Sequence, residues 1–137
     1  MNNYFTPIMT RQEVNQISAL GLAHLGDGVF ELLVRTWLCT HGGCKAGKLH
    51  KQTVAHVSAP AQAARVDRML PLLTEEETDL YRRGRNAHTH AVPKNATHEQ
   101  YSKATGLECL LGGLYLLGQR ERINELFVLT MEDTHGL

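Results

Sequence analysis

Apolar residues recur every three to four positions along almost the whole chain, with polar residues between them. This spacing is the period of an amphipathic α-helix, and no stretch alternates strictly enough to indicate a β-strand. The pattern predicts seven helices, at residues 11–20, 22–40, 48–57, 58–70, 74–86, 98–117 and 120–133, and a mobile loop at 87–96. We therefore expect an all-α fold in which a single domain, residues 1–137, forms a helical bundle.

Short motifs mark several of the expected helix ends. Thr10 with Glu13, and Thr74 with Glu77, have the spacing of a capping box, in which two side chains satisfy backbone amides at the start of a helix. Gly118 suits the end of the helix at 98–117, because glycine readily adopts the left-handed conformation that closes many helices. These signals support the boundaries drawn from the apolar pattern.

The composition is that of an ordinary soluble globular protein, with 42% hydrophobic and 20% charged residues among 137. No apolar run is long enough to cross a bilayer, and the first residues lack the basic and then apolar pattern of a secretory signal. Three cysteines, an odd number, suit reduced thiols: Cys39, Cys44 and Cys109. We expect a cytoplasmic protein with no membrane partner.

Charge is unevenly distributed, although the formal net charge is zero. An acidic stretch at 72–79 precedes a stretch with four cations and no acid: Arg82, Arg83, Arg85 and Lys94. Such a local basic run can bind phosphate even on a neutral protein. The alternative is a solvated helix end, because cations also stabilise helix C-termini.

One carboxylate, Glu108, is the only charge in the apolar segment between Lys103 and Arg120. Burying a charge inside an apolar helix is unfavourable unless a cation or a hydrogen-bond donor meets it. On a helix, Thr105 and Gly112 share the face of Glu108, so small or polar neighbours leave space for a partner. A metal ion is the simplest such partner.

Asp27 is the second candidate acid. It lies between Gly26 and Gly28, and each glycine destabilises a helix by about 1 kcal/mol relative to alanine, which is explained if a backbone or a ligand approaches closely. The alternative is a solvated Asp27 beside a surface pair of Glu31 and Arg35. If the helices of Asp27 and Glu108 pack together, both carboxylates can hold one Mg²⁺ or Mn²⁺ ion.

Two segments resemble motifs of one enzyme family. The segment LGDGVFELLV is similar to the signature helix of the ribonuclease III catalytic domain, typically LGDAVLEL, and ATGLECLLGGLYL resembles its second metal-ligand helix. The short length, the lack of an appended double-stranded-RNA-binding domain, and the stretches GKLHKQTVAHVSAPAQA and YRRGRNA point to the Mini-ribonuclease III subfamily. The resemblance covers residues 17–128 and implies a ribonuclease III endonuclease-like helical bundle.

The resemblance also implies an activity and its residues. Asp27 and Glu108 fall on the family's catalytic and metal-binding acids, with Mg²⁺ as cofactor and Mn²⁺ as a substitute. Two further family acids are replaced by Ala23 and Thr105, and His24 replaces an aromatic residue. The implied enzyme is a homodimer that cleaves double-stranded RNA, leaving 5′-phosphate and 3′-hydroxyl ends. Its implied substrate is the large-subunit (23S) ribosomal RNA precursor, with possible assistance from a ribosomal protein.

Double-stranded RNA is read largely through its shape, phosphates and 2′-hydroxyls, so a few cations suffice as contacts. The candidates for RNA binding are Lys48, Arg82, Arg83, Arg85, Asn86 and Lys94. Alternative roles remain for two of them: Asn86 can cap its helix, and Arg82 can pair with acids at 75–77.

Other readings of the sequence compete with the metal-dependent nuclease. One is a non-catalytic RNA-binding or ribosome-associated module on the same fold, and another is a small phosphohydrolase that uses His24 or His50. The stretch GGCKAGK resembles a nucleotide-binding P-loop, but Leu49 stands where Ser or Thr is required. Cys39, His41, Cys44 and His50 lack the paired spacing of a zinc site, and Cys109 is expected to be a buried thiol.

Overall fold

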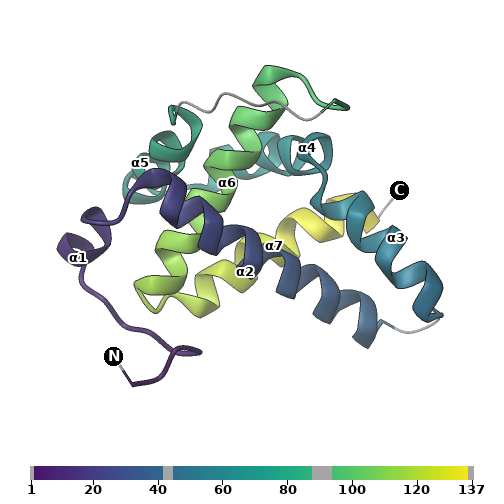
Figure 1. Ribbon diagram of the computed structural model, residues 1–137, viewed down its shortest axis with the longest axis horizontal. Coiled ribbons are helices and arrows are strands. Elements are labelled where there is room, and N and C mark those ends of the chain that lie inside the picture. Colours follow the sequence, from purple (N-terminus) through teal and green to yellow (C-terminus); the bar gives the residue numbers. More distant parts are fainter. Residues whose placement is uncertain (1, 42–44, 88–93, 136–137) are drawn as a thin grey trace.

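The computed structural model describes the backbone of residues 2–41, 45–87 and 94–135, and side chains as far as residue 131. These parts contain seven α-helices and one short 3-10 helix, and no strand (Figure 1). The helices are α1 (Arg11–Asn15), α2 (Ala19–Thr40), α3 (Ala46–Val57), α4 (Ala59–Met69), the 3-10 helix η1 (Leu70–Leu72), α5 (Glu75–Arg85), α6 (His98–Leu116) and α7 (Arg120–His135). The expected all-α fold with seven helices is confirmed.

The largest difference from the expected boundaries lies near the N-terminus. The helix expected at 11–20 is only five residues long, and α2 begins at Ala19 and not at residue 22. Ser18 causes the break, because its extended backbone ends the preceding turn and its hydroxyl accepts a hydrogen bond from the Gly21 amide at 3.0 Å. The apolar residues around Ser18 concealed this cap in the sequence.

The other helix-end signals are confirmed. Both predicted capping boxes form, at Thr10 and at Thr74, and a third forms where Thr97 and Gln100 begin α6. Gly118 has a φ of 78°, a left-handed conformation that allows the chain to turn from α6 into α7. Most of the loop expected at 87–96 lies outside the described residues.

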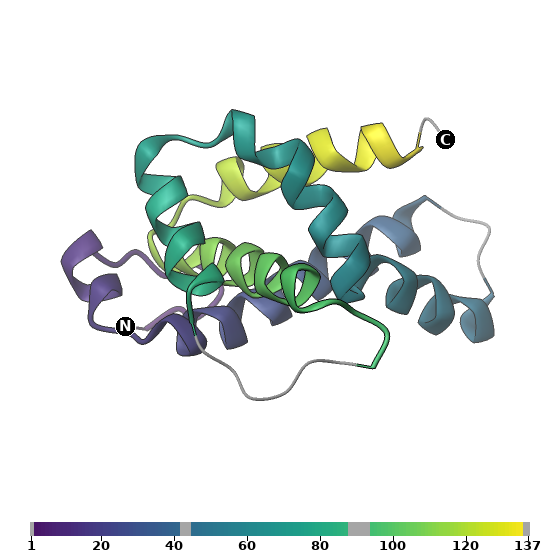
Figure 2. The same cartoon turned by 90° about the horizontal axis from the view of Figure 1, so that it is seen from above.

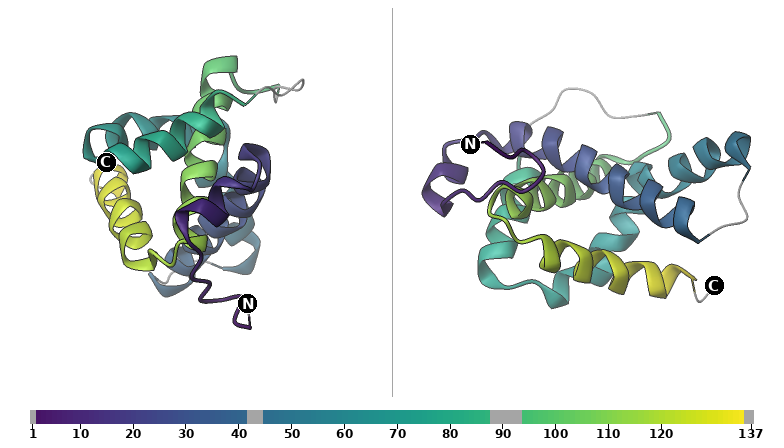
Figure 3. Two further views of the ribbon diagram at one scale, coloured as in Figure 1. Left: turned by 90° about the vertical axis from the view of Figure 1, so that its left-hand side faces the viewer. Right: turned by 90° about the horizontal axis from the view of Figure 1, so that it is seen from below.

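Helix α6 occupies the centre of the molecule. It contacts α2, α4, α5 and α7, and the views in Figures 2 and 3 show it running between α2 on one side and α5 and α7 on the other. Helices α1 and α3 lie at opposite ends of the long axis (Figure 1). This central position explains why α6 is apolar on nearly all sides and not on one face only.

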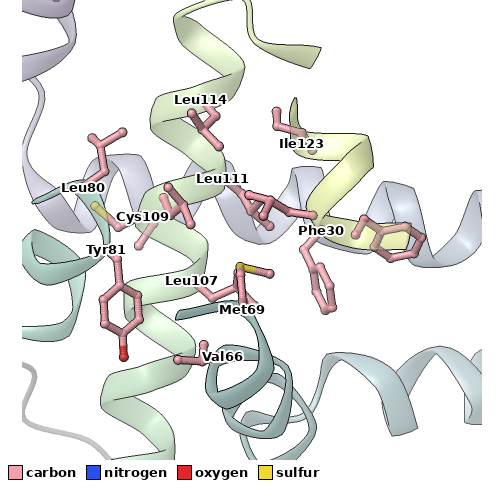
Figure 4. Packing of buried hydrophobic residues seen from close by; sticks show 14 of the residues in the cluster. Phe30, Val66, Met69, Leu80, Tyr81, Leu107, Cys109, Leu111, Leu114 and Ile123 are labelled. Atoms are coloured by element: carbon pink, nitrogen blue, oxygen red, sulfur yellow. The ribbon is translucent and has the colours of Figure 1, made fainter. Parts of the chain in front are cut away.

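Side chains from five helices meet around α6 and form the core (Figure 4). The residues labelled there are Phe30 of α2, Val66 and Met69 of α4, Leu80 and Tyr81 of α5, Leu107, Cys109, Leu111 and Leu114 of α6, and Ile123 of α7. The core also contains a buried cation, Arg65, whose guanidinium lies 5.3 Å from the centre of the Phe30 ring and 5.4 Å from that of Phe127. Cation–π attraction and a hydrogen bond to Thr130 stabilise this charge.

Helices α2 and α6 approach so closely that their backbones touch. A Cβ atom added at Gly26 would lie 1.6 Å from the carbonyl oxygen of Glu108, and one added at Gly112 would lie 2.0 Å from that of Leu22. Close backbone approach therefore explains Gly26, as the sequence suggested. It does not explain Gly28, where an added Cβ would meet nothing within 4 Å.

None of the helices in the described parts of the chain is long and apolar enough to span a membrane.

The two glycines of α2 give a matched test of this contact. Gly26→Ala should destabilise the protein by about 1–3 kcal/mol or more, because the added methyl forces the two backbones apart. Gly28→Ala meets no atom and should be neutral or stabilising by up to about 1 kcal/mol, because alanine favours the helix. Urea denaturation of both variants measures the difference. Equal or greater stability of Gly26→Ala would contradict the contact.

Candidate active site

The two acids singled out in the sequence come together at the crossing of α2 and α6. Asp27 follows Gly26, whose backbone touches the Glu108 carbonyl, so the glycine contact places one carboxylate beside the other. Asp27 is exposed to solvent, whereas Glu108 is partly buried. The Asp27 carboxylate acts on Glu108 both as a neighbouring charge and as a hydrogen-bond partner.

This environment favours the protonated form of Glu108. Burial and, after it, the negative charge of Asp27 raise the pKa of Glu108 to about 8, while a hydrogen bond from Gln62 acts in the opposite direction. Across the part of the chain that the structure describes, neither carboxylate forms an ion pair with a basic side chain. Two adjacent carboxylates without a cation must share a proton or bind a positive ion.

The donor set fits a hard divalent cation. Two carboxylates offer oxygen ligands, and Mg²⁺ is commonly held in proteins by one or two carboxylates, with waters completing its octahedral shell. Among the described residues no group of three or more acids, histidines or cysteines converges, so the protein contribution is the pair itself. Ala23 is apolar, and the buried Thr105 hydroxyl donates to the Tyr101 carbonyl at 3.0 Å, so neither adds an acid.

Comparison with known proteins places this arrangement in a family. A family model described as "Ribonuclease III domain" matches residues 20–119, which include both acids. The chain belongs to the ribonuclease III family.

Similar proteins within the family identify the subfamily to which the chain is related. The chain is 42% identical over 127 residues to a Mini-ribonuclease 3 of Thermoanaerobacter sp., covering 93% of this chain and 89% of the relative. It is 46% identical over 107 residues to the Mini-ribonuclease 3 of Symbiobacterium thermophilum, covering 78% and 82% of the two chains. These matches confirm the Mini-ribonuclease III resemblance and an endoribonuclease of the ribonuclease III type. They favour an enzyme over the RNA-binding module and the phosphohydrolase considered from the sequence.

A solved structure agrees with the fold. The crystal structure of protein FN1578 from Fusobacterium nucleatum superposes with a TM-score of 0.80 and 30% sequence identity, covering 89% of this chain and 98% of that protein. The family model assigns this helical arrangement to the ribonuclease III domain, and the FN1578 structure shares it.

Glu31 is paired with a cation of its own helix. Its carboxylate accepts a hydrogen bond from Arg35 at 2.9 Å, one turn further along α2. The surface pair considered as an alternative in the sequence therefore exists, and Asp27 lies beside it on the same helix. An exposed pair at this spacing contributes a few tenths of a kcal/mol.

The candidate RNA-binding residues occupy two classes of position. Five are exposed: Lys48, Arg82, Arg85, Asn86 and Lys94. Arg83 is half-buried and donates to the Ile17 carbonyl at 2.6 Å, so part of its guanidinium is used inside the protein.

The alternative roles considered for two of these residues have different outcomes. Asn86 is the C-cap residue of α5, as considered from the sequence. The acids at 75–77 interact with other cations: Arg122 binds Glu77 at 2.8 Å, and Arg11 lies 3.5 Å from Glu76. No ion pair links Arg82 to them within the described residues, so its guanidinium remains directed to the surface.

The competing motifs lie partly outside the described residues, and among those that are described no group of three or more acids, histidines or cysteines converges. Lys45 and Lys48, at the start of α3, are exposed, and Cys44 and the residues just before it lie outside the described part of the chain. Cys109 is fully buried in the core, and burial raises the pKa of its thiol to about 11, as expected for an unreactive cysteine.

Sequence reasoning missed one residue of the site. Gln62, on the buried face of α4, donates a hydrogen bond to the Glu108 carboxylate at 3.3 Å. The only signal in the sequence is a polar residue one turn before Val66, on a buried face that also contains Arg65. Because Gln62 is 46 residues from Glu108, no local pattern connects the two.

The raised pKa of Glu108 predicts how stability depends on pH. Without metal, folded Glu108 keeps its proton up to about pH 8, whereas the unfolded chain releases it near the ordinary glutamate pKa of 4.5. The stability contributed by this group is therefore fully present below pH 4.5 and is lost as pH rises through 8. Glu108→Gln lacks this titration, so the variant should gain stability relative to the wild type over that interval.

Urea denaturation of both proteins in chelator, at pH 5 and pH 8.5, measures the effect. At pH 8.5, saturating Mg²⁺ should make the wild type more stable than Glu108→Gln, because only the wild type has both charged ligands for the ion. A constant difference between the two proteins at both pH values would contradict the raised pKa.

Proposed function

We propose that this chain is a Mg²⁺-dependent endonuclease for double-stranded RNA and that Asp27 and Glu108 are its catalytic, metal-binding carboxylates. The observation that carries the proposal is the convergence of two carboxylates without a cation at the glycine contact of α2 and α6. The resemblance of both helices to the ribonuclease III motifs supports the same assignment. Residues 1–137 are taken to form one catalytic domain.

The chemistry divides between the protein and its cofactor. A divalent ion bound by two carboxylates polarises a phosphodiester and activates water for attack. Asp27 and Glu108 hold the ion, and Asp27, exposed on α2, presents the site to a large substrate. The rigid helix crossing fixes the distance between the two backbones that carry the carboxylates, which brings the ligands close enough to bind one ion.

The proposed substrate is recognised by shape and charge. The exposed polar and basic side chains at the C-terminal end of α5, Arg82, Arg85 and Asn86, together with Lys48 and Lys94, are proposed to contact RNA phosphates. Arg83, also a candidate from the sequence, has Nη2 bonded to the Ile17 carbonyl and Nη1 buried, so it is proposed to contribute to RNA binding through its positive charge and not through a direct Nη contact.

The biological substrate we propose is the precursor of large-subunit (23S) ribosomal RNA, with assistance from a ribosomal protein. This step rests on the resemblance to the Mini-ribonuclease III subfamily. A cytoplasmic location, where thiols stay reduced, suits the free Cys39 and Cys109.

A homodimer is proposed because cutting both strands of a duplex needs two sites. Helix α2 supplies support: Leu20 and Leu32, three turns apart, are 46% and 58% exposed, and His24 and Gly28 lie between them on the same face. This stripe runs beside Asp27. A second copy of the chain would bury the two leucines and bring a second acidic pair near the first.

The assignment of the acids predicts the effect of neutral isosteres. Glu108→Gln or Asp27→Asn should preserve folding and duplex binding but reduce Mg²⁺-dependent cleavage by roughly a thousandfold or more, because several kcal/mol of charge stabilisation is lost. Glu31→Gln is the matched control on α2, since its carboxylate is bound to Arg35, and it should cut at the wild-type rate. Gel electrophoresis of a labelled duplex, with and without Mg²⁺, measures the cleavage rate of each variant. Wild-type cleavage by either site variant would refute the assignment.

The proposed phosphate contacts predict a salt effect. Arg85→Ala should weaken duplex binding and lower the slope of log affinity against log salt by about 1, whereas kcat at saturating RNA stays unchanged. Arg120→Ala removes an exposed cation at the start of α7, outside the proposed surface, and should leave the slope intact. Fluorescence anisotropy at several salt concentrations gives both slopes. An unchanged slope in Arg85→Ala would remove this residue from the RNA surface.

A further inference from the structure

Gln62 joins three helices through one side-chain amide. It is 2% exposed, in the first turns of α4, immediately after Ser58 caps that helix. Its Nε2 donates to the Val57 carbonyl at 2.9 Å and to Glu108 Oε2 at 3.3 Å. Val57 is the last residue of α3, and Glu108 belongs to α6. The amide therefore connects the junction of α3 and α4 to the acidic pair.

The orientation of this amide follows from its partners. The Val57 carbonyl can only accept, so the NH₂ group must face it, and the second hydrogen of this group is then directed to the Glu108 carboxyl oxygen. Rotating the amide by half a turn would place Oε1 against two oxygens. Oε1 itself accepts no hydrogen bond from the described residues, which is unfavourable for a buried oxygen. The site keeps this unsatisfied atom and directs both donors to Val57 and Glu108.

We propose that Gln62 is a positioning residue that holds the Glu108 carboxylate in the rotamer that binds the metal ion together with Asp27. This inference rests on the proposed function of the two acids. A glutamate has three rotatable side-chain bonds, and the anchored amide limits them because its other hydrogen is fixed to the α3 terminus. Gln62 does not replace a missing ligand; it keeps in place one of the two carboxylates proposed to bind the ion.

Metal affinity provides the direct test. Gln62→Met keeps the length and apolar stem but has no donor, and Gln62→Asn keeps the amide but is one methylene too short to reach Glu108. Both should weaken Mn²⁺ binding to the metal-free protein about tenfold, as measured from the electron paramagnetic resonance signal of free Mn²⁺. The matched control is Thr53→Val, which removes another buried polar group whose hydroxyl bonds only within α3, to Leu49, and should bind Mn²⁺ as the wild type does.

Kinetics separate positioning from a general loss of structure. In both Gln62 variants kcat on a short RNA duplex should fall about tenfold while KM for the duplex stays unchanged, and excess Mn²⁺ should restore most of the rate. Wild-type Mn²⁺ affinity in a folded Gln62 variant would overturn the inference; if Gln62→Met fails to fold, Gln62→Asn decides alone. Glu108→Gln is measured in parallel: if it binds Mn²⁺ as tightly as the wild type, the metal site itself is wrong, and the role of Gln62 falls with it.

Discussion

The direct contact between the backbones of α2 and α6 is the constraint on which the rest of the structure depends. At Gly26 and Gly112 any side chain would overlap a carbonyl oxygen of the other helix, so the two helices can meet only where both sequences supply a glycine. The same contact determines which residues of the two helices face each other. Because Asp27 follows Gly26 and Glu108 lies one turn before Gly112, the carboxylates converge as a consequence of helix packing.

Convergence of the acids opposes folding, and the surrounding core must offset it. Partial burial and the charge of Asp27 both disfavour ionised Glu108, and no basic side chain among the described residues compensates. The strain is electrostatic and local, whereas α6 packs against four helices through leucines that are almost completely buried. A rigid, apolar central helix can therefore carry one unfavourable carboxylate, and a bound cation converts that unfavourable interaction into ligand affinity.

The parts of this molecule that could be predicted from sequence are those with local causes. Helix periodicity and the capping motifs at Thr10, Thr74 and Gly118 depend on residues within a few positions of one another, and they appear where expected. The early end of α1 was missed because Ser18 lies among apolar residues that continue the helical pattern. Asp27 and Glu108 could be proposed as partners because glycines flank Asp27, Glu108 is the only charge of an apolar helix, and each motif resembles a known family.

Long-range contacts between polar groups had no comparable signal. Nothing near Gln62 indicates that its amide reaches a carboxylate 46 residues away, and the basic run of α5 does not reveal that Arg83 turns inward to the Ile17 carbonyl. The first contact needs α4 to pack against α6, and the second needs α5 to pack beside the start of α2. The sequence thus identifies chemical groups, and the packing decides which of them act together.

The small number of acids gives the neighbours of the site more influence. With Ala23 and Thr105 at positions where the family resemblance places further acids, the repulsion that folding must overcome is limited to one pair of carboxylates. No further acid at these positions can compensate for a lost ligand, because a two-carboxylate site loses half of its protein donors if one side chain rotates away. The Gln62 amide, which contacts Glu108 from a third helix, leaves its own buried Oε1 without a hydrogen bond. This unfavourable feature is offset if restricting the Glu108 carboxylate preserves the geometry of the whole site.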